Sequence, residues 1–404
     1  MTDSVELYNA HVIDLRIAYT IKKNLQAIGL SQTDISIYED RLFNYLIKLE
    51  NVDTGSAVLL ESCMKGLDGT VVMNNGSGHS VPGQSDVIVS CSRHTIYRLI
   101  QRLREEPFNL DQLSREIEES LPANKLKIAW GKRTLDFSDK TYVMGILNCT
   151  PDSFYSASCA PTLESAEEKA LKMIADGVDI IDVGGESSRP GSESVETSEE
   201  LKRAVPVIKM IREKSEVLIS IDTRKSEVAE QAIEAGADIV NDISGLKENT
   251  ALAKLIAEKG IPVIIMHMRG TPKDMQEEPF YKDTVSDILK EIKSAVAFAQ
   301  SCGISRKKII VDPGIGFGKR VEDNLRIIQQ LASLQSLNLP ILIGISRKSF
   351  IAGIIKQPVE NRLTGTITAN TMAILNGTDI VRVHDVPDAL EMVQIIDAVR
   401  RVNY

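Results

Sequence analysis

Polar residues that could bind a ligand recur at the ends of short apolar runs in the last two thirds of the chain. Asp182 stands in I-I-D-V-G, Asp222 in S-I-D-T and Asp312 in V-D-P-G. Asn241 adds an amide in V-N-D-I-S. A carboxylate in an apolar run is costly unless hydrogen-bond donors meet it, so several that converge favour a site over structural caps. The residue types leave open whether they accept hydrogen bonds from an N–H-rich heterocycle or bind a metal ion.

Cationic residues end the last two apolar runs. S-R-K-S occupies 346–349 and R-V-H occupies 382–384. Arg presents a planar fork and Lys a point charge to phosphate oxygens, so the two motifs together predict an anion site. The glycine-rich segment 314–319, G-I-G-F-G-K, has the spacing of neither the dinucleotide nor the P-loop fingerprint. It predicts a shaped pocket wall with Phe317 available for aromatic contact.

The elements that carry these residues alternate in type. Eight short apolar runs are separated by stretches with helical spacing of apolar residues; the runs are 142–148, 179–185, 217–223, 238–244, 262–268, 308–314, 340–346 and 379–385. This rhythm predicts an α/β fold, a (β/α)8 TIM barrel with its site at the carboxyl ends of the strands. A doubly wound open sheet also alternates strand and helix, but polar strand ends throughout favour closure.

The first part of the chain lacks this rhythm. We expect residues 1–124 to form a small α/β or α+β domain of unknown role, with helices at 34–50, 93–105 and 109–120. Residues 125–404 form the predicted barrel domain, which begins with a hairpin at 125–139 that covers the barrel floor. T-x-x-E at 197–200 predicts a capping box, in which Thr197 caps a helix and Glu200 bonds back to it.

Composition narrows the class of protein. The net charge of -9 over 404 residues argues against a nucleic-acid partner, because phosphate binding needs clustered Lys and Arg. Five scattered cysteines without a C-x-x-C pair predict neither a zinc site nor a disulfide framework. The N-terminus lacks a signal-peptide pattern, and no apolar run reaches the roughly 18 residues that span a membrane. We therefore expect a cytoplasmic protein with no membrane partner.

Eight motifs, in order, resemble those of the dihydropteroate synthase family over roughly two thirds of the chain. They are MGILNCTPDSF, IIDVGGESSRPGS, SIDTRK, VNDIS, MHMRGTP, VDPGIGFGK, GISRKSF and VRVHDV. The resemblance implies a transferase of folate biosynthesis and a target of sulfonamides. The family condenses 6-hydroxymethyl-7,8-dihydropterin diphosphate with p-aminobenzoate, and we expect the same reaction here, by an SN1-like route with Mg²⁺ as the cofactor. The small-molecule substrates are its expected partners, and family members are commonly homodimers.

The resemblance also implies the site residues. It assigns the pterin ring to Asp182, Asp222, Asn241, Met266, Asp312, Gly344 and Lys348. It assigns p-aminobenzoate to Ser188, Arg189, Pro190, Phe317 and Ser346. It assigns the diphosphate to Asn148, Arg382 and His384, with Asn148 as the metal ligand, and catalysis to Lys348, Arg382, His384 and Asp152.

Two departures and two alternatives accompany the resemblance. The family usually has Thr at Ser188 and an aliphatic residue at Cys149, so amine preference or sulfonamide sensitivity could differ. A pterin-dependent corrinoid methyltransferase shares the barrel and the pterin aspartates, but it needs no diphosphate site. A non-catalytic pterin-binding protein is the second alternative, and the retained polar strand ends argue against it.

Overall fold

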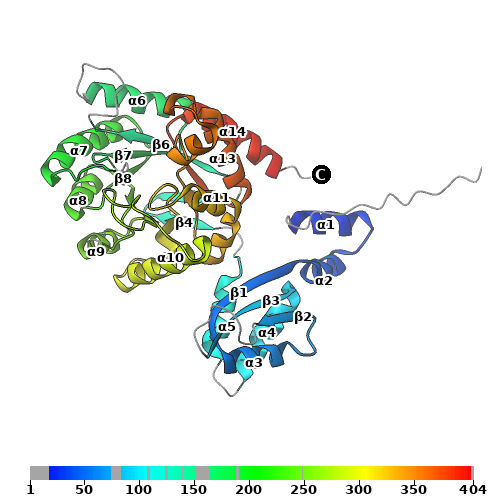
Figure 1. Cartoon of the computed structure of the whole chain (residues 1–404). Coiled ribbons are helices and arrows are strands. Elements are labelled where there is room, and N and C mark those ends of the chain that lie inside the picture. Colours follow the sequence, from blue (N-terminus) through cyan, green and yellow to red (C-terminus); the bar gives the residue numbers. More distant parts are fainter. Residues whose placement is uncertain are drawn as a thin grey trace, which may run out of the picture. The chain divides into compact units, whose positions relative to one another are not determined.

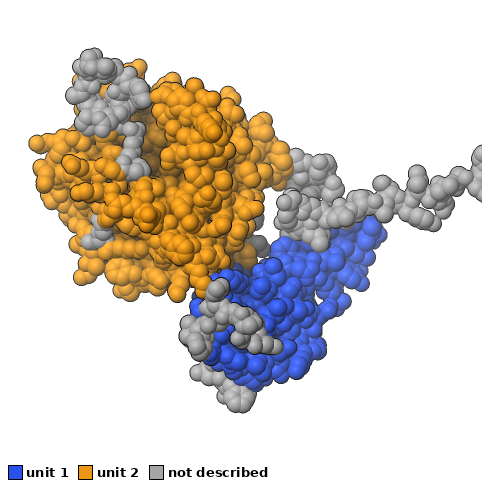
Figure 2. Space-filling view, in the orientation of Figure 1, with its two compact units in different colours: residues 1–121 blue, residues 122–404 orange. Residues whose placement is uncertain are grey.

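The computed structural model describes residues 18–73, 83–106, 110–122, 126–138, 140–150, 163–187, 191–247 and 249–401. The chain divides into two compact units, Met1–Leu121 and Pro122–Tyr404, which Figure 2 colours separately. Among the described residues, every helix is too short or too polar to span a lipid bilayer.

The first unit is an antiparallel sheet with helices. Its three strands have the order β1-β3-β2 and are β1 (Asn44–Asp53), β2 (Gly69–Met73) and β3 (Gln84–Ser92). Its helices are α1 (Ala18–Ala27), α2 (Gln32–Leu42), α3 (Thr54–Met64), α4 (Arg93–Glu105) and α5 (Asp111–Ser120). Alternate residues of β3, including Val87 and Val89, pack against Leu99 and Leu103 of α4 in one apolar core. The unit is therefore of the α+β type.

The helix predicted over 34–50 is wrong in its second half. Helix α2 ends at Leu42, and β1 begins at Asn44 and pairs with β3. Tyr45, Ile47 and Leu49 are the more buried residues of β1, at the period of two that a strand requires. The Leu, Lys and Glu residues of this segment favour helix locally, but the partner strand and the core beneath it override that preference.

The second unit is a closed parallel barrel, as predicted, and the open-sheet alternative is wrong. Its strands have the order β11-β10-β9-β8-β7-β6-β13-β12. They are β6 (Tyr142–Asn148), β7 (Ile180–Gly184), β8 (Leu218–Asp222), β9 (Ile239–Asp242), β10 (Val263–Met266), β11 (Ile309–Asp312), β12 (Leu342–Ile343) and β13 (Ile380–Val383). A parallel bridge between Val311 and Ile341, with Val311 N donating to Pro340 O at 2.9 Å, joins the two ends of the sheet.

Helices surround the barrel, as Figure 1 shows. They are α6 (Leu163–Asp176), α7 (Thr197–Lys214), α8 (Ser226–Glu234), α9 (Thr250–Lys259), α10 (Thr284–Ser301), α11 (Val321–Gln329), α12 (Ser349–Ile355), α13 (Leu363–Leu375) and α14 (Val386–Arg400). Short 3-10 helices are η2 (Arg306–Lys308), η3 (Leu331–Leu337) and η4 (Val359–Asn361). The predicted hairpin is β4 (Lys127–Trp130) with β5 (Arg133–Asp136), whose Ile128 and Leu135 belong to the barrel core.

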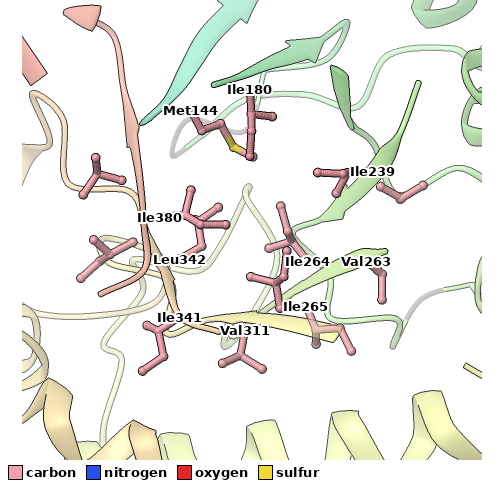
Figure 3. Packing of buried hydrophobic residues seen from close by; sticks show 14 of the residues in the cluster. Met144, Ile180, Ile239, Val263, Ile264, Ile265, Val311, Ile341, Leu342 and Ile380 are labelled. Atoms are coloured by element: carbon pink, nitrogen blue, oxygen red, sulfur yellow. The ribbon is translucent and has the colours of Figure 1, made fainter. Parts of the chain in front are cut away.

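The core of the second unit is built from the strands and the inner faces of the helices. Figure 3 shows part of it, with Met144 of β6, Ile180 of β7 and Ile380 of β13 among the labelled side chains. Strands β7, β9, β10 and β11 are buried along their whole length, as expected for a parallel sheet covered on both faces. This packing fixes the strand ends, and with them the polar side chains that the strands carry.

The predicted capping box at the start of α7 does not form. The residue before the helix is Glu196, and it has no side-chain cap hydrogen bond. Glu200 is buried and accepts hydrogen bonds from the Thr223 hydroxyl at 2.6 Å and from Lys225 Nζ at 2.6 Å. The Glu200 carboxylate, which the local pattern assigned to the start of the helix, instead binds the segment after β8.

Candidate active site

Four residues predicted to bind substrate form one hydrogen-bonded group at the mouth of the barrel. Arg382 on β13 donates from Nε to Asp182 Oδ2 on β7 at 2.6 Å and from Nη2 to Asp222 Oδ2 at the end of β8 at 2.9 Å. Asn241 on β9 donates from Nδ2 to the same Asp182 oxygen at 3.1 Å. The donor-rich partner that a buried Asp182 requires is thus supplied by two other strands.

One buried carboxylate oxygen at this mouth lacks a hydrogen-bond donor among the described residues. This oxygen is Asp182 Oδ1. Burial raises the pKa of Asp222 to about 7, helped by the negative charges of Asp182 and Glu200 and opposed by Arg382. A buried carboxylate oxygen without a donor is energetically costly, so this arrangement favours a ligand that brings N–H groups.

Asp312, Lys348 and Phe317 form the adjoining wall. Asp312, at the end of β11, accepts a hydrogen bond from Gly314 N at Oδ1 over 2.7 Å, and burial raises its pKa against the opposing charge of Lys348. Burial lowers the pKa of Lys348 to about 8. Lys348 Nζ donates to Ile315 O and lies 4.5 Å from the centroid of the Phe317 ring. An ammonium over an aromatic face is an attractive cation–π contact.

The two cationic motifs, which the sequence predicts to bind an anion, also bond to each other and to the residue that follows the second motif. His384 N donates to Ser346 Oγ at 3.2 Å, and His384 Nδ1 lies 2.9 Å from the same oxygen. Arg347 pairs with Asp385 through two bonds of 2.8 Å and also donates to the carbonyls of Val359 and Glu360. Arg347 therefore links the loop after β12 to the end of β13, and its side-chain hydrogen bonds stabilise that loop.

Three further predicted residues, Asn148, Met266 and Gly344, also line this end of the barrel. Gly184 has no side chain, and a Cβ there would lie 3.5 Å from Asn148 Oδ1 and 3.9 Å from Asp222 Oδ2. Met266 is buried in a cluster that includes Phe317. A Cβ at Gly344 would lie 3.8 Å from Lys348 Nζ and 3.9 Å from Arg382 Cβ, so the glycine leaves room for both cations.

Four predicted residues lie outside the described part of the chain. They are Asp152 of the first loop and Ser188, Arg189 and Pro190 of the second. Their assigned roles remain predictions from the resemblance.

Sequence reasoning missed two polar clusters behind the mouth. Lys225 donates to Glu186 Oε2 and Glu200 Oε2, each at 2.6 Å. Lys319 is buried, and its Nζ lies 3.0 Å from His267 Nδ1. No local pattern distinguishes these lysines from solvated ones, because their partners come from segments distant in sequence.

Comparison with known proteins identifies the barrel. Residues 144–384 match the family of pterin binding enzymes. A dihydropteroate synthase of a Synechocystis strain is 43% identical over 293 residues, which cover 72% of this chain and 99% of that protein.

Solved structures agree with this likeness. A Yersinia pestis dihydropteroate synthase with a sulfonamide drug is 38% identical, has a TM-score of 0.65, and covers 68% of this chain and 99% of its own. The Xanthomonas albilineans dihydropteroate synthase with 4-aminobenzoic acid is 34% identical, also has a TM-score of 0.65, and covers 69% of this chain and 100% of its own. The chain therefore belongs to the dihydropteroate synthase family of pterin-binding enzymes.

Proposed function

We propose that the protein condenses 6-hydroxymethyl-7,8-dihydropterin diphosphate with p-aminobenzoate, giving 7,8-dihydropteroate and diphosphate. One observation carries this proposal: an acceptor-rich subsite adjoins a cationic one at the same mouth. Asp182, with one buried oxygen unmatched, lies on the acceptor side. Arg382 joins the two sides through its bonds to Asp182 and Asp222. A substrate with an N–H-rich ring and an anionic leaving group fits both.

The pterin ring would occupy the acceptor-rich side. Its 2-amino and N3 hydrogens would be donated to Asp312, whose Oδ1 already accepts from Gly314 N and is thereby oriented. Asp182, Asp222, Asn241, Met266, Gly344 and Lys348 complete the proposed subsite. Because Asp312 and Asp222 are buried, each hydrogen bond they accept from the ring acts in a medium of low dielectric and discriminates strongly against rings that lack the donor.

The diphosphate would lie against Arg382, His384 and Asn148. The described residues contain no group of three or more His, Cys, Asp or Glu that could hold a metal ion. Mg²⁺ usually keeps several waters and binds through few protein oxygens plus substrate phosphates. Asn148, a half-buried residue at the end of β6 whose Oδ1 lies beside Gly184, fits this kind of site. When bound, Mg²⁺ would neutralise charge on the departing diphosphate.

The residues of this chain then have separate tasks in an SN1-like reaction. Arg382 and His384 would stabilise the negative charge that grows on the leaving diphosphate. The electron-rich pterin ring stabilises the methylene cation that remains, so no covalent nucleophile from the protein is required. Phe317, Lys348 and Ser346, with Ser188, Arg189 and Pro190, would hold p-aminobenzoate so that its amine faces that carbon. Asp152, on the first loop, would help to shield the cation from water.

Release of diphosphate tests the proposal. The purified protein would be incubated with the pterin diphosphate and Mg²⁺, with and without p-aminobenzoate, and both diphosphate and dihydropteroate would be measured. Amine-dependent release with dihydropteroate as the product is expected. Pterin binding without amine-dependent turnover would favour a binding protein or another amine, and omission of Mg²⁺ should slow release if the metal assignment holds.

We also propose that the protein is a homodimer that acts in the cytoplasm. Exposed apolar side chains gather on the neighbouring helices α11 to α14; they are Val321, Leu325, Ile354, Ile355, Met372, Leu375, Ile395 and Val399. Helices α7 to α10, all of whose residues are described, contribute no large exposed apolar side chain. Apolar side chains exposed on four neighbouring helices favour association with a second copy. Light scattering should give a mass twice that of one chain. The Leu375→Asp variant should have the mass of a single chain.

A further inference from the structure

Lys319 is a buried lysine that the proposed reaction does not use. Its side chain follows the glycine-rich segment 314–318, and the residue is 3% exposed. Nζ donates to Phe317 O at 2.9 Å, to His267 Nδ1 at 3.0 Å and to His267 O at 3.3 Å. None of the described carboxylates lies within 4.0 Å of Nζ, so its three donors are met by neutral acceptors from two loops.

The histidine that accepts from Lys319 is held in one tautomer. His267 Nε2 lies 3.1 Å from Glu291 Oε2, and burial lowers the pKa of His267 to about 4, so the ring is neutral. Glu291 also accepts from Arg269, which pairs with its other oxygen. Nε2–H therefore donates to Glu291, and the Nδ1 lone pair is left to accept from Lys319.

The loop after β11 is fastened at every carbonyl from 315 to 318. Lys348 donates to Ile315 O, and Gln276 Nε2 donates to Gly316 O at 2.7 Å. Lys319 donates to Phe317 O at 2.9 Å, and the Tyr281 hydroxyl donates to Gly318 O at 2.8 Å. The fastening groups other than Lys348 and Lys319 come from the segment after β10, so the two loops form one unit.

Glycine allows the two loops to meet backbone to backbone. At Gly314 a Cβ would lie 2.0 Å from His267 O, and at Gly318 it would lie 2.4 Å from Arg269 O. Both glycines have positive φ, at 68° and 61°. Lys319 lies at this seam, because it bonds the carbonyls of His267 on one side and Phe317 on the other.

We propose that Lys319 is a positioning residue for the p-aminobenzoate subsite. It holds the Phe317 peptide against the segment after β10, and it thereby sets the Phe317 ring and the Lys348 ammonium 4.5 Å from the ring centroid. The Lys348 side chain packs closely against Gly316, where an added Cβ would lie 3.2 Å from Lys348 Cδ, so a shift of the loop would also move Lys348. The inference rests on the proposed function, which assigns Phe317 to the amine subsite.

Lys319→Met and a matched control, Lys308→Met, test it by steady-state kinetics. Lys308 also donates to a backbone carbonyl of another segment, Gly260 O between α9 and β10. Unlike Lys319, it lies directly before β11, at the other end of the strand. In Lys319→Met we expect the KM for p-aminobenzoate to rise about tenfold, which corresponds to about 1.4 kcal/mol. The KM for the pterin diphosphate, whose proposed subsite shares Lys348 but not Phe317, should rise less. Lys308→Met should keep both constants.

A double-mutant cycle separates positioning from a general structural role. If Lys319 acts through the ring, its effect on the KM for p-aminobenzoate should disappear in a Phe317→Ala background. An equal effect in both backgrounds, or an unchanged KM in folded Lys319→Met, overturns the inference. Wild-type protein without amine-dependent diphosphate release would instead refute the proposed function.

Gln276→Ala provides a test that does not depend on the buried lysine. Gln276 is exposed, so its loss should leave the fold intact, yet it fastens the adjacent carbonyl of the same loop. We expect a rise of about threefold in the KM for p-aminobenzoate, from the loss of one hydrogen bond of about 0.5–1 kcal/mol. If Lys319→Met fails to fold, an unchanged KM in Gln276→Ala overturns the inference.

Discussion

The two ends of the barrel carry the same residue type with different hydrogen-bond partners. The floor, at the amino ends of the strands, has Asp179, Asp238 and Asp379, each directly before a strand. The mouth, at the carboxyl ends, has Asp182, Asp222 and Asp312. Each floor aspartate accepts a hydrogen bond from the backbone of a neighbouring strand or its start, whereas the mouth retains an acceptor without a donor.

Each floor aspartate forms a hydrogen bond with the backbone of an adjacent strand or its start. Asp179 accepts from Val143 N at 2.9 Å, Asp238 from Ile219 N at 3.0 Å and Asp379 from Ile341 N at 2.8 Å. Each satisfies a backbone donor near the start of a neighbouring strand, where the ladder has not yet begun. These side chains therefore satisfy backbone donors at the floor of the barrel.

The difference shows how strand-end aspartates can be sorted. The floor carboxylates accept hydrogen bonds from the chain itself, whereas Asp182 at the mouth keeps a buried oxygen without a donor, which costs stability. Exchanging Asp for Asn at either end should therefore separate stability from binding.

The largest effect is expected at the mouth, from Asp312→Asn. The Asn side chain can still accept from Gly314 N, but its NH₂ group would face the ring N–H groups that the carboxylate would accept. Two charge-assisted hydrogen bonds of about 1.5–3 kcal/mol each would be lost, so pterin affinity should fall at least about 100-fold. Calorimetric titration measures the affinity. Unchanged affinity in a folded variant would contradict the assignment of Asp312.

The matching change at the floor, Asp238→Asn, should reduce stability and leave catalysis alone. Asp238 pairs with Arg212 at 2.6 Å and Arg133 at 2.7 Å in a mostly buried setting. Removal of one partner of such a pair costs about 2–3 kcal/mol, which should lower Tm by about 4–10 °C. Thermal unfolding measures the loss, and kcat/KM should stay within about threefold. A large loss of activity at unchanged Tm would show that Asp238 acts in catalysis and not in stability.

Activity should also respond to pH through the mouth residues, in a range above the one in which Asp379 of the floor titrates. Burial raises the pKa of Asp222 to about 7, so below this pH the carboxyl is protonated and accepts poorly. Burial lowers the pKa of Lys348 to about 8, so its ammonium is lost above this pH. A plot of kcat/KM against pH should therefore be bell-shaped, with a maximum between 7 and 8. Asp222→Asn should remove the acid limb, and an acid limb below pH 5 in the native protein would exclude this origin.

The smallest effect is expected at Asp379→Asn, and its sign is opposite to that at Asp238. Burial raises the pKa of Asp379 to about 6, above the value of about 3.9 for an unfolded Asp. The native state then binds more protons between these values, so stability falls as pH rises from about 4 to 6 and stays lower above. The Asn variant should be more stable by about 1–2 kcal/mol at pH 8 and unchanged at pH 4. Equal differences at both pH values would exclude ionisation as the cause.

Much of the barrel could be predicted from local sequence. The apolar runs and the helical spacing between them set strand and helix, and a polar residue that ends a buried strand is brought to the mouth by the parallel topology itself. Asp182, Asp222, Asn241 and Arg382 were placed there by this rule, and the structure brings them into contact. The family motifs then indicated the substrates.

The strand at 44–50 and the role of Glu200 could not be predicted in this way. Local preference favours helix at 44–50, but pairing with β3 decides the outcome. Glu200 fits a capping box locally, yet Lys225 and Thr223 bind its carboxylate.

Local sequence patterns are enough to predict the order of strands and helices, the parallel barrel and the strand-end residues Asp182, Asp222, Asn241 and Arg382 at its mouth. The partners of those residues follow only from the three-dimensional fold. Arg382 reaches carboxylates 200 and 160 positions away in the chain, and Lys319 bonds to a histidine 52 positions away. The physical reason is that burial and hydrogen-bond satisfaction depend on neighbours in space, whereas spacing and propensity act over only a few turns of chain.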